Sequence, residues 1–229
     1  MWPSLVVFDM AGTTVHDRDY VNLAVIEGFR VNDFDCSISM INPLMGIAKP
    51  RAIEMVLREA KDSRSENADY VNQVHEDFLK AIIGFYESDL DVREVAGAGM
   101  VFQNLRSRGC KVALDTGFSR ETADVILRRL GWDDSVIDFS VTSDEVENGR
   151  PYADMIFLAM NELDILDPLS VAKVGDTPSD MGQGIAAGCG WVIGVSEGTH
   201  TEEQLIAAGA THVIPNVSYL FSMVFDTEN

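Results

Sequence analysis

Short apolar runs and amphipathic stretches alternate along most of this chain. Buried strands are expected at runs rich in Val, Ile, Leu or Phe, namely Leu5–Phe8, Lys111–Asp115, Val136–Ser140, Val171–Val174 and Trp191–Val195. Residues with helical periodicity fill the intervals and predict helices at Val101–Arg108, Glu121–Leu130, Ala153–Asn161, Asp180–Ala187 and Glu202–Ala208. Strands that alternate with helices of this length indicate right-handed βαβ units. The fold class predicted is therefore α/β, with a doubly wound parallel sheet.

One stretch interrupts this alternation. Between about Val15 and Asp91 no buried strand is expected, and the periodicity predicts only helices, around Tyr20–Arg30, Pro50–Lys61 and Asn67–Tyr86. A helical insert after the first strand would stand over the carboxyl ends of the strands, where ligands bind in open α/β sheets, and could act as a lid. We predict a Rossmann-like core at residues 1–14 and 92–229, with an inserted α-helical cap at residues 15–91.

The composition narrows the possible partners and the compartment. The chain has 17 Lys and Arg against 37 Asp and Glu, a net charge of -20, which argues against nucleic acid and anionic membranes as partners. A small anionic substrate would be repelled too, unless a metal ion or local cations reverse the field in the pocket. No signal peptide or membrane-length apolar stretch is evident, and Cys36, Cys110 and Cys189 show no paired spacing. A cytoplasmic location is expected.

Candidate chemistry begins where the predicted strands end. Asp9 follows the first apolar run, and the small residues of Ala11-Gly12-Thr13 let the backbone approach a ligand closely. Asp176 and Asp180 follow the strand Val171–Val174, four residues apart. The three carboxylates can converge on one divalent cation, and Mg²⁺ prefers carboxylate, water and phosphate oxygens. Alternatively, Asp176 and Asp180 serve as turn and helix-start residues, which leaves the matching acidic strand end at Asp9 unexplained.

Two further segments could bind phosphate. The strand Lys111–Asp115 leads into Thr116-Gly117, where a hydroxyl, a flexible amide and a following helix N-terminus form a seat for phosphate. Arg150 stands just before a proline that can start a helix, and its guanidinium could stabilise charge on a transferring phosphoryl group. In isolation both signals are weak, since many βα turns look alike and most arginines lie on the surface.

Together the four strand-end motifs, in this order, resemble those of the haloacid dehalogenase superfamily over nearly the whole chain. The resemblance implies that Asp9 is the nucleophile that accepts a phosphoryl group. It also implies that Thr116 and Arg150 stand where that superfamily has its phosphate-binding Thr and its usual Lys. Asp176 and Asp180 match the acidic metal motif.

Ala11 departs from the superfamily pattern. Its backbone carbonyl can still bind the metal, but the superfamily usually has a second Asp there, which protonates the leaving group and later activates water. Loss of a general acid/base costs about 10²–10⁴ in rate, so ordinary phosphate monoester hydrolysis is disfavoured. Ala11, Gly12-Thr13 and Arg150 in place of Lys together resemble the phosphonatase branch, that of phosphonoacetaldehyde hydrolase and its close relatives. There a lid lysine forms a Schiff base with the substrate aldehyde, and the iminium draws electrons from the C–P bond.

The predicted cap contains a matching lysine. Met45-Gly46-Ile47-Ala48-Lys49-Pro50 resembles the Met-Gly-x-x-Lys segment of that branch, which implies that Lys49 forms the imine and Met45 contacts substrate. A position at a helix N-terminus and burial under a lid would both lower the pKa of Lys49. The alternative is a solvated lysine at a helix start. One mismatch is Ala52, since phosphonoacetaldehyde hydrolase has a His three residues after its lysine.

These observations predict a Mg²⁺-dependent hydrolase that cleaves the C–P bond of a phosphonoacetaldehyde-like aldehyde. The path would use a Schiff base on Lys49 and an aspartyl-phosphate intermediate on Asp9. A second hypothesis is a phosphate monoester phosphatase, similar to phosphoglycolate phosphatases, with Lys49 as a binding contact only. A third is a non-enzymatic, receiver-like Mg²⁺-binding module. The expected partner is a small phosphorylated or phosphonate metabolite, and the resemblance makes a homodimer through the cap plausible.

Overall fold

A computed structural model of the chain describes residues 2–17 and 19–226. Its centre is one sheet of parallel strands in the order β3-β2-β1-β4-β5-β6. The strands are β1 (Leu5–Asp9), β2 (Lys111–Thr116), β3 (Phe139–Thr142), β4 (Val171–Gly175), β5 (Trp191–Val195) and β6 (His212–Ile214). The strand order reverses direction on either side of β1, as in doubly wound sheets. The predicted α/β fold class is confirmed.

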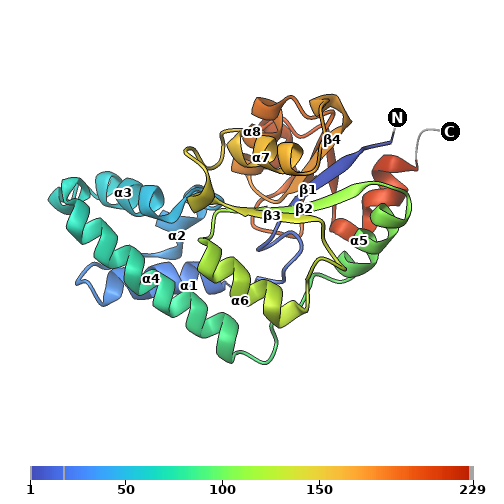
Figure 1. The fold of residues 1–229 in the computed structure, drawn as a ribbon. Coiled ribbons are helices and arrows are strands. Elements are labelled where there is room, and N and C mark those ends of the chain that lie inside the picture. Colours follow the sequence, from blue (N-terminus) through green and yellow to red (C-terminus); the bar gives the residue numbers. More distant parts are fainter. Residues whose placement is uncertain (1, 18, 227–229) are drawn as a thin grey trace.

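Helices cover both faces of this sheet (Figure 1). They are α1 (Tyr20–Arg30), α2 (Ile38–Ile41), α3 (Lys49–Glu59), α4 (Ala68–Ser88), α5 (Ala98–Ser107), α6 (Arg120–Leu130), α7 (Asp154–Glu162), α8 (Pro178–Ala187) and α9 (Glu202–Ala207). Along β1, Leu5 and Val7 pack towards α7 and α8, whereas Val6 and Phe8 pack into the larger cluster with α5 and α6. Burial on both faces explains why the strands read as continuous apolar runs.

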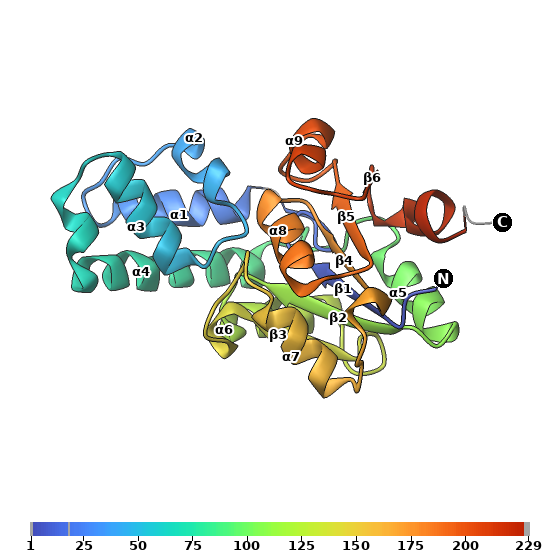
Figure 2. The ribbon, with the colours of Figure 1, turned by 90° about the horizontal axis from the view of Figure 1, so that it is seen from above.

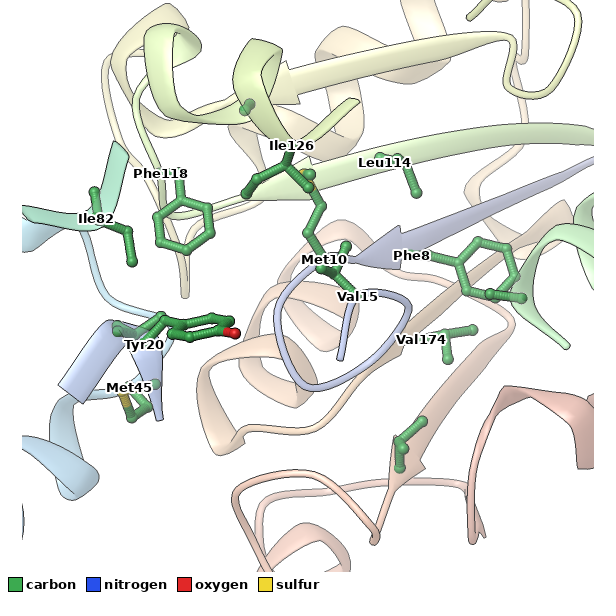
Figure 3. Close-up of a cluster of buried hydrophobic side chains, with 14 of the residues drawn as sticks. Phe8, Met10, Val15, Tyr20, Met45, Ile82, Leu114, Phe118, Ile126 and Val174 are labelled. Atoms are coloured by element: carbon green, nitrogen blue, oxygen red, sulfur yellow. The ribbon is translucent and has the colours of Figure 1, made fainter. Parts of the chain in front are cut away.

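The helices α1, α2, α3 and α4 lie between β1 and α5 in the chain and extend beyond one edge of the sheet (Figures 1 and 2). Their apolar side chains join the larger core cluster: Tyr20, Met45 and Ile82 belong to the same cluster as Leu114 and Phe118 (Figure 3). The division into a core at residues 1–14 and 92–229 and a cap at 15–91 remains a prediction.

Element boundaries agree with the sequence pattern in most places and fail at β3. The prediction of a strand at Val136–Ser140 is wrong by about three residues, because the strand runs from Phe139 to Thr142. The backbone N–H groups of Val136 and Ile137 donate to the carbonyl of Asp133, so this apolar run begins in a turn. The structure also contains α2 and β6, which are too short for the pattern to show. No helix among the described residues is long and apolar enough to cross a membrane.

Candidate active site

The carboxyl ends of β1, β2 and β4 meet at one edge of the sheet, where the helices α1 to α4 also approach. Asp9 ends β1 and stands beside Asp115 of β2 in the strand register. A small cavity opens at this edge. Its lining includes eight of the nine residues expected from the sequence: Asp9, Ala11, Met45, Lys49, Thr116, Gly117, Arg150 and Asp176. The ninth, Asp180, lies behind the cavity wall, and its carboxylate reaches Asp9 and Asp176.

Three buried carboxylates form the candidate metal centre. Oxygen atoms of Asp9, Asp176 and Asp180 all lie within 4.8 Å of one another, and each residue is at most 4% exposed. Burial, reinforced by the two neighbouring carboxylates, raises the pKa of Asp9 to about 7, and burial also raises the pKa of Asp176. Such a group of like charges can stay ionised together only beside a cation. An all-oxygen set of this kind fits Mg²⁺.

A charge count at this edge points the same way. The buried carboxylates are Asp9, Asp115, Asp176 and Asp180, and the buried cations paired with them are Arg150 and Lys173. Among the described residues, four carboxylates are thus ion-paired or clustered with only two paired cations, and Lys49 in the same cavity forms no ion pair with them. A divalent cation would balance the difference, since uncompensated charge is costly away from water.

The turn after β1 is built for close approach to Asp176. Gly12 has φ +88°, and a Cβ there would lie 2.6 Å from Asp176 Oδ2. Thr13 donates its hydroxyl to Asp176 Oδ1 at 3.2 Å. Thr199, in the loop after β5, donates its backbone N–H and its hydroxyl to Asp176 Oδ2 at 2.7 and 2.6 Å. These donors fix the orientation of the carboxylate before any ligand binds.

Arg150 lies inside the site and not on the surface. It is 4% exposed, and its Nη1 lies 2.6 Å from Asp9 Oδ1 and 3.0 Å from Asp180 Oδ1. Its Nη2 lies 2.5 Å from Asp115 Oδ1. Burial alone would raise the pKa of Asp180, but Arg150 and Lys173 outweigh it and hold that pKa below its usual value. The guanidinium thus connects the acidic groups at the ends of two strands.

Lys49 is the first residue of α3 and is buried, with 5% of its surface exposed. The alternative of a solvated helix-start lysine is therefore wrong. Among the described residues it has no ion pair, and its Nζ donates only to the carbonyl of Ile47 at 3.4 Å. Burial, followed by the positive charge of Arg150, lowers the pKa of Lys49 to about 8. A lysine in this state is a neutral amine for an appreciable fraction of the time near pH 7 to 8.

The turn before Lys49 packs directly on the sheet's loops. Gly46 has φ +80°, and a Cβ there would lie 2.7 Å from Thr177 Oγ1. A Cβ on Gly117 would lie 3.2 Å from the carbonyl oxygen of Gly46. Neither glycine can be replaced by a larger residue without moving the turn at Gly46 away from the loops that contain Gly117 and Thr177. Phe118 donates its backbone N–H to Thr116 Oγ1 at 3.2 Å, which closes the candidate phosphate seat.

Sequence reasoning did not single out Asp115, Lys173 or Thr199. Two signals were present in the chain. Lys173 interrupts an apolar strand, and a lysine in a fully buried strand requires an anionic partner. Asp115 ends its strand as Asp9 ends β1. Thr199 follows the last residue of β5 by four positions and carried no signal beyond its place after a strand.

Comparisons with known proteins identify a family and similar folds. A family model described as haloacid dehalogenase-like hydrolase matches residues 3–188. A phosphonoacetaldehyde hydrolase from Bacillus cereus (strain G9842) is 31% identical over an alignment that covers 87% of this chain and 80% of the relative.

Two solved structures are also similar in fold. A phosphonoacetaldehyde hydrolase like protein from Oleispira antarctica superposes with a TM-score of 0.85 at 21% identity, covering 97% of this chain and 92% of that one. A putative phosphoglycolate phosphatase from Lactobacillus delbrueckii subsp. bulgaricus gives a TM-score of 0.78 at 20% identity, covering 96% and 97%. At these identities the two structures bear on the fold alone.

Proposed function

This chain belongs to the haloacid dehalogenase-like hydrolase family, and on that premise we propose that it is a Mg²⁺-dependent hydrolase of the C–P bond in phosphonoacetaldehyde or a closely similar aldehyde. The observation that carries the proposal is Lys49, a buried amine without an ion-pair partner among the described residues, which lines the same cavity as Asp9. Family membership as a hydrolase also removes the receiver-like hypothesis.

The first step belongs to Lys49. Its neutral amine attacks the aldehyde carbon, and loss of water leaves a protonated imine, which is an electron sink two bonds from phosphorus. The pKa of Lys49, lowered to about 8 by burial and by Arg150, favours the neutral form needed for attack. Ala52 carries no proton, so water or another side chain must move the protons of this step.

The second step belongs to Asp9. A carboxylate oxygen of Asp9 attacks phosphorus, the C–P bond breaks, and its electron pair moves into the imine to give an enamine on Lys49. Water then attacks the phosphorus of the aspartyl phosphate, which releases inorganic phosphate and restores the Asp9 carboxylate. The enamine takes up a proton and is hydrolysed, which releases the aldehyde product and frees the amine.

Other residues hold the phosphoryl group and the metal. Asp9, Asp176, Asp180 and the carbonyl of Ala11 would hold Mg²⁺, which would neutralise charge on the phosphoryl oxygens and on the nucleophile. Arg150, and the hydroxyl of Thr116 with the amide of Gly117, would bind those oxygens from the other side. Met45, 7% exposed in the cavity wall, would help to exclude water from the imine.

Ala11 separates this proposal from the phosphate monoester hypothesis. An alcohol leaving group needs a proton, and the methyl group of Ala11 supplies none, whereas an enamine leaves by electron flow into the imine. A monoesterase would use Lys49 for binding alone. Burying a lysine without a carboxylate partner costs free energy of folding, and phosphate binding alone does not require such burial.

Borohydride trapping tests the proposal. Wild-type protein with MgCl₂ is incubated with phosphonoacetaldehyde, with and without sodium borohydride, and phosphate release and peptide masses are measured. We expect phosphate release, borohydride inactivation that requires the aldehyde, and a reduced adduct on the peptide that contains Lys49. The control is Lys61→Arg, a change at an exposed residue just after α3 that should leave labelling and turnover intact.

Phosphoglycolate serves as the competing substrate. The proposal is overturned if Lys49→Arg releases phosphate as fast as the wild type, or if phosphoglycolate is hydrolysed and phosphonoacetaldehyde is not. Either result would favour the monoester hypothesis.

A further inference from the structure

Asp115 is a buried carboxylate shared by two cations. It is 0% exposed, and its Oδ1 lies 2.5 Å from Arg150 Nη2 and in close contact with Lys173 Nζ. Its backbone carbonyl also accepts from Arg150 Nη2 at 2.7 Å. The proposed reaction leaves this residue without a role, although it contacts Arg150, which lines the cavity.

The strand register explains why Asp115 and Asp9 need a cation between them. The two residues are partners on neighbouring parallel strands, so their side chains project from the same face of the sheet. Lys173 pairs with Val7 in the register of β1 and β4, and therefore stands on that face as well. Like charges directly opposite one another destabilise a sheet. Arg150 bridges the pair, with Nη1 on Asp9 and Nη2 on Asp115.

A guanidinium differs from an ammonium in having two arms in one rigid plane. Each arm must find a partner when the side chain is buried, or a desolvated donor is left unsatisfied. At Arg150 one arm reaches Asp9 and Asp180, which belong to the reacting end of the site. The other arm reaches Asp115 twice, through its carboxylate and its carbonyl.

We propose that Asp115 is a positioning residue for Arg150. It holds the Nη2 arm and thereby fixes the plane of the guanidinium, so that the Nη1 arm points to Asp9 and to the oxygens of a transferring phosphoryl group. Lys173 is the counter-ion that keeps the buried carboxylate paired, with Asp180 3.0 Å from its Nζ. This inference rests on the proposed function only in placing the phosphoryl group beside Asp9.

A double-mutant cycle tests the coupling. The variants are Asp115→Asn, Arg150→Lys and the two combined, and the readout is the dissociation constant of orthovanadate with MgCl₂ by calorimetry. Orthovanadate is an oxyanion probe of the phosphoryl seat that requires no C–P cleavage. We expect Asp115→Asn to weaken binding about tenfold in the Arg150 background and less than about twofold in the Arg150→Lys background. A lysine has no second arm to hold.

The chain offers a matched control in Asp138. This carboxylate is also shared by two cations, 3.3 Å from Arg106 and 3.2 Å from Lys111, but near the amino end of β2. Asp138→Asn should leave orthovanadate binding within about twofold in both backgrounds. An equal effect of Asp115→Asn in both backgrounds would overturn the proposal, because a merely structural carboxylate gives additive losses.

A second variant covers the case in which Asp115→Asn does not fold. Asp115→Leu with Lys173→Met removes one buried negative and one buried positive charge together, an exchange that folded proteins often tolerate. We expect a folded protein with about tenfold weaker orthovanadate binding. Wild-type affinity in this variant would overturn the proposal.

The two proposals fail separately. If the wild type binds orthovanadate with the expected coupling but does not cleave phosphonoacetaldehyde, the positioning role stands and the proposed function fails. If it cleaves phosphonoacetaldehyde and the cycle is additive, the reverse holds. A wild type that does not bind orthovanadate overturns the positioning role.

Discussion

Two buried lysines stand on opposite sides of the same site and are treated differently by the fold. Lys173, 0% exposed in β4, has its ammonium between the carboxylates of Asp115 and Asp180. Lys49, 5% exposed at the start of α3, has no ion pair among the described residues and one long hydrogen bond to Ile47. Both ammonium groups are buried away from water, but among the described residues only that of Lys173 is paired with carboxylates.

The difference separates two kinds of buried charge. On the sheet side, ion pairs hold Asp115, Arg150, Lys173 and Asp180 in place, as the metal and phosphate binding proposed for this region would require. On the helical side, desolvation and then the positive charge of Arg150 outweigh the attraction of Asp9 and Asp17, lower the pKa of Lys49 to about 8 and favour the neutral amine. Burial alone therefore does not indicate whether a lysine is structural or chemical; its partners do.

The largest expected effect concerns activity on the helical side. Lys49→Arg keeps the positive charge but cannot form an imine, so turnover of phosphonoacetaldehyde should fall by about 10²–10⁴-fold, the range for losing a catalytic group. Steady-state phosphate release measures it, with Lys61→Arg as the control. Undiminished turnover would contradict the proposal that Lys49, unlike Lys173, takes part in the reaction.

The next effect concerns stability on the sheet side. Lys173→Met leaves Asp115 and Asp180 with one cation fewer and should destabilise the fold by about 3 kcal/mol. That corresponds to a fall in Tm of roughly 6–12 °C for a domain of this size. Calorimetry or circular dichroism measures it. A Tm within about 2 °C of the wild type would show that Lys173 is not needed to pair these carboxylates.

Metal binding should stabilise the same side. Mg²⁺ at about 100 times its dissociation constant should add about 2.7 kcal/mol and raise Tm by roughly 5–10 °C, and chelation should reverse this. Asp180→Asn, which removes one carboxylate of the acidic group, should lose most of the increment. An equal increment in both proteins would place the metal elsewhere.

The pH dependence of kcat/KM should reveal the pKa of the Lys49 amine. In the proposed reaction Lys49 acts as the neutral amine, with a pKa of about 8. The active form is deprotonated, so kcat/KM measured with Mg²⁺ should rise with pH, about fivefold between pH 7 and 8, and level off above 8. A rising limb that continues towards pH 10 would mean an unperturbed lysine.

The smallest expected effect is a gain in stability. Lys49→Met removes an unpaired, desolvated cation and should stabilise the fold by about 1 kcal/mol, or roughly 2–4 °C in Tm, while activity is lost. The pKa of Lys49 in the folded protein lies below its unfolded value, so the charge destabilises fully below pH 8. The gain should therefore shrink as pH rises from about 8 towards 10.5. A loss of stability at pH 7 would contradict the view that Lys49, unlike Lys173, is an unpaired buried charge.

Much of the fold could be predicted because burial on both faces leaves a plain apolar signal. The boundaries of α1 and β5 agree with the sequence pattern to the residue. The pattern misplaced β3, because Ile137 is buried in a turn and apolar character reports burial and not conformation. It also gave no sign of β6, a three-residue edge strand.

The candidate site divides in the same way. Asp9, Asp176 and Asp180 could be found because each follows or closes an apolar run, and parallel strands bring their carboxyl ends together. Lys49 could be found only through a resemblance, since its spacing alone also fits a solvated helix start. The roles of all these residues stay predictions until the variants are measured.

The linear sequence determined which groups are present at the strand ends and that a helical insert follows the first strand. Only the tertiary structure decided their partners: that Arg150 joins Asp9 to Asp115, that Lys173 is compensated and that Lys49 is not. The physical reason is that electrostatic energy depends on distance and burial between residues far apart in the chain. Hydrophobic periodicity, by contrast, depends on residues close together in the sequence, so it can be recognised without the tertiary structure.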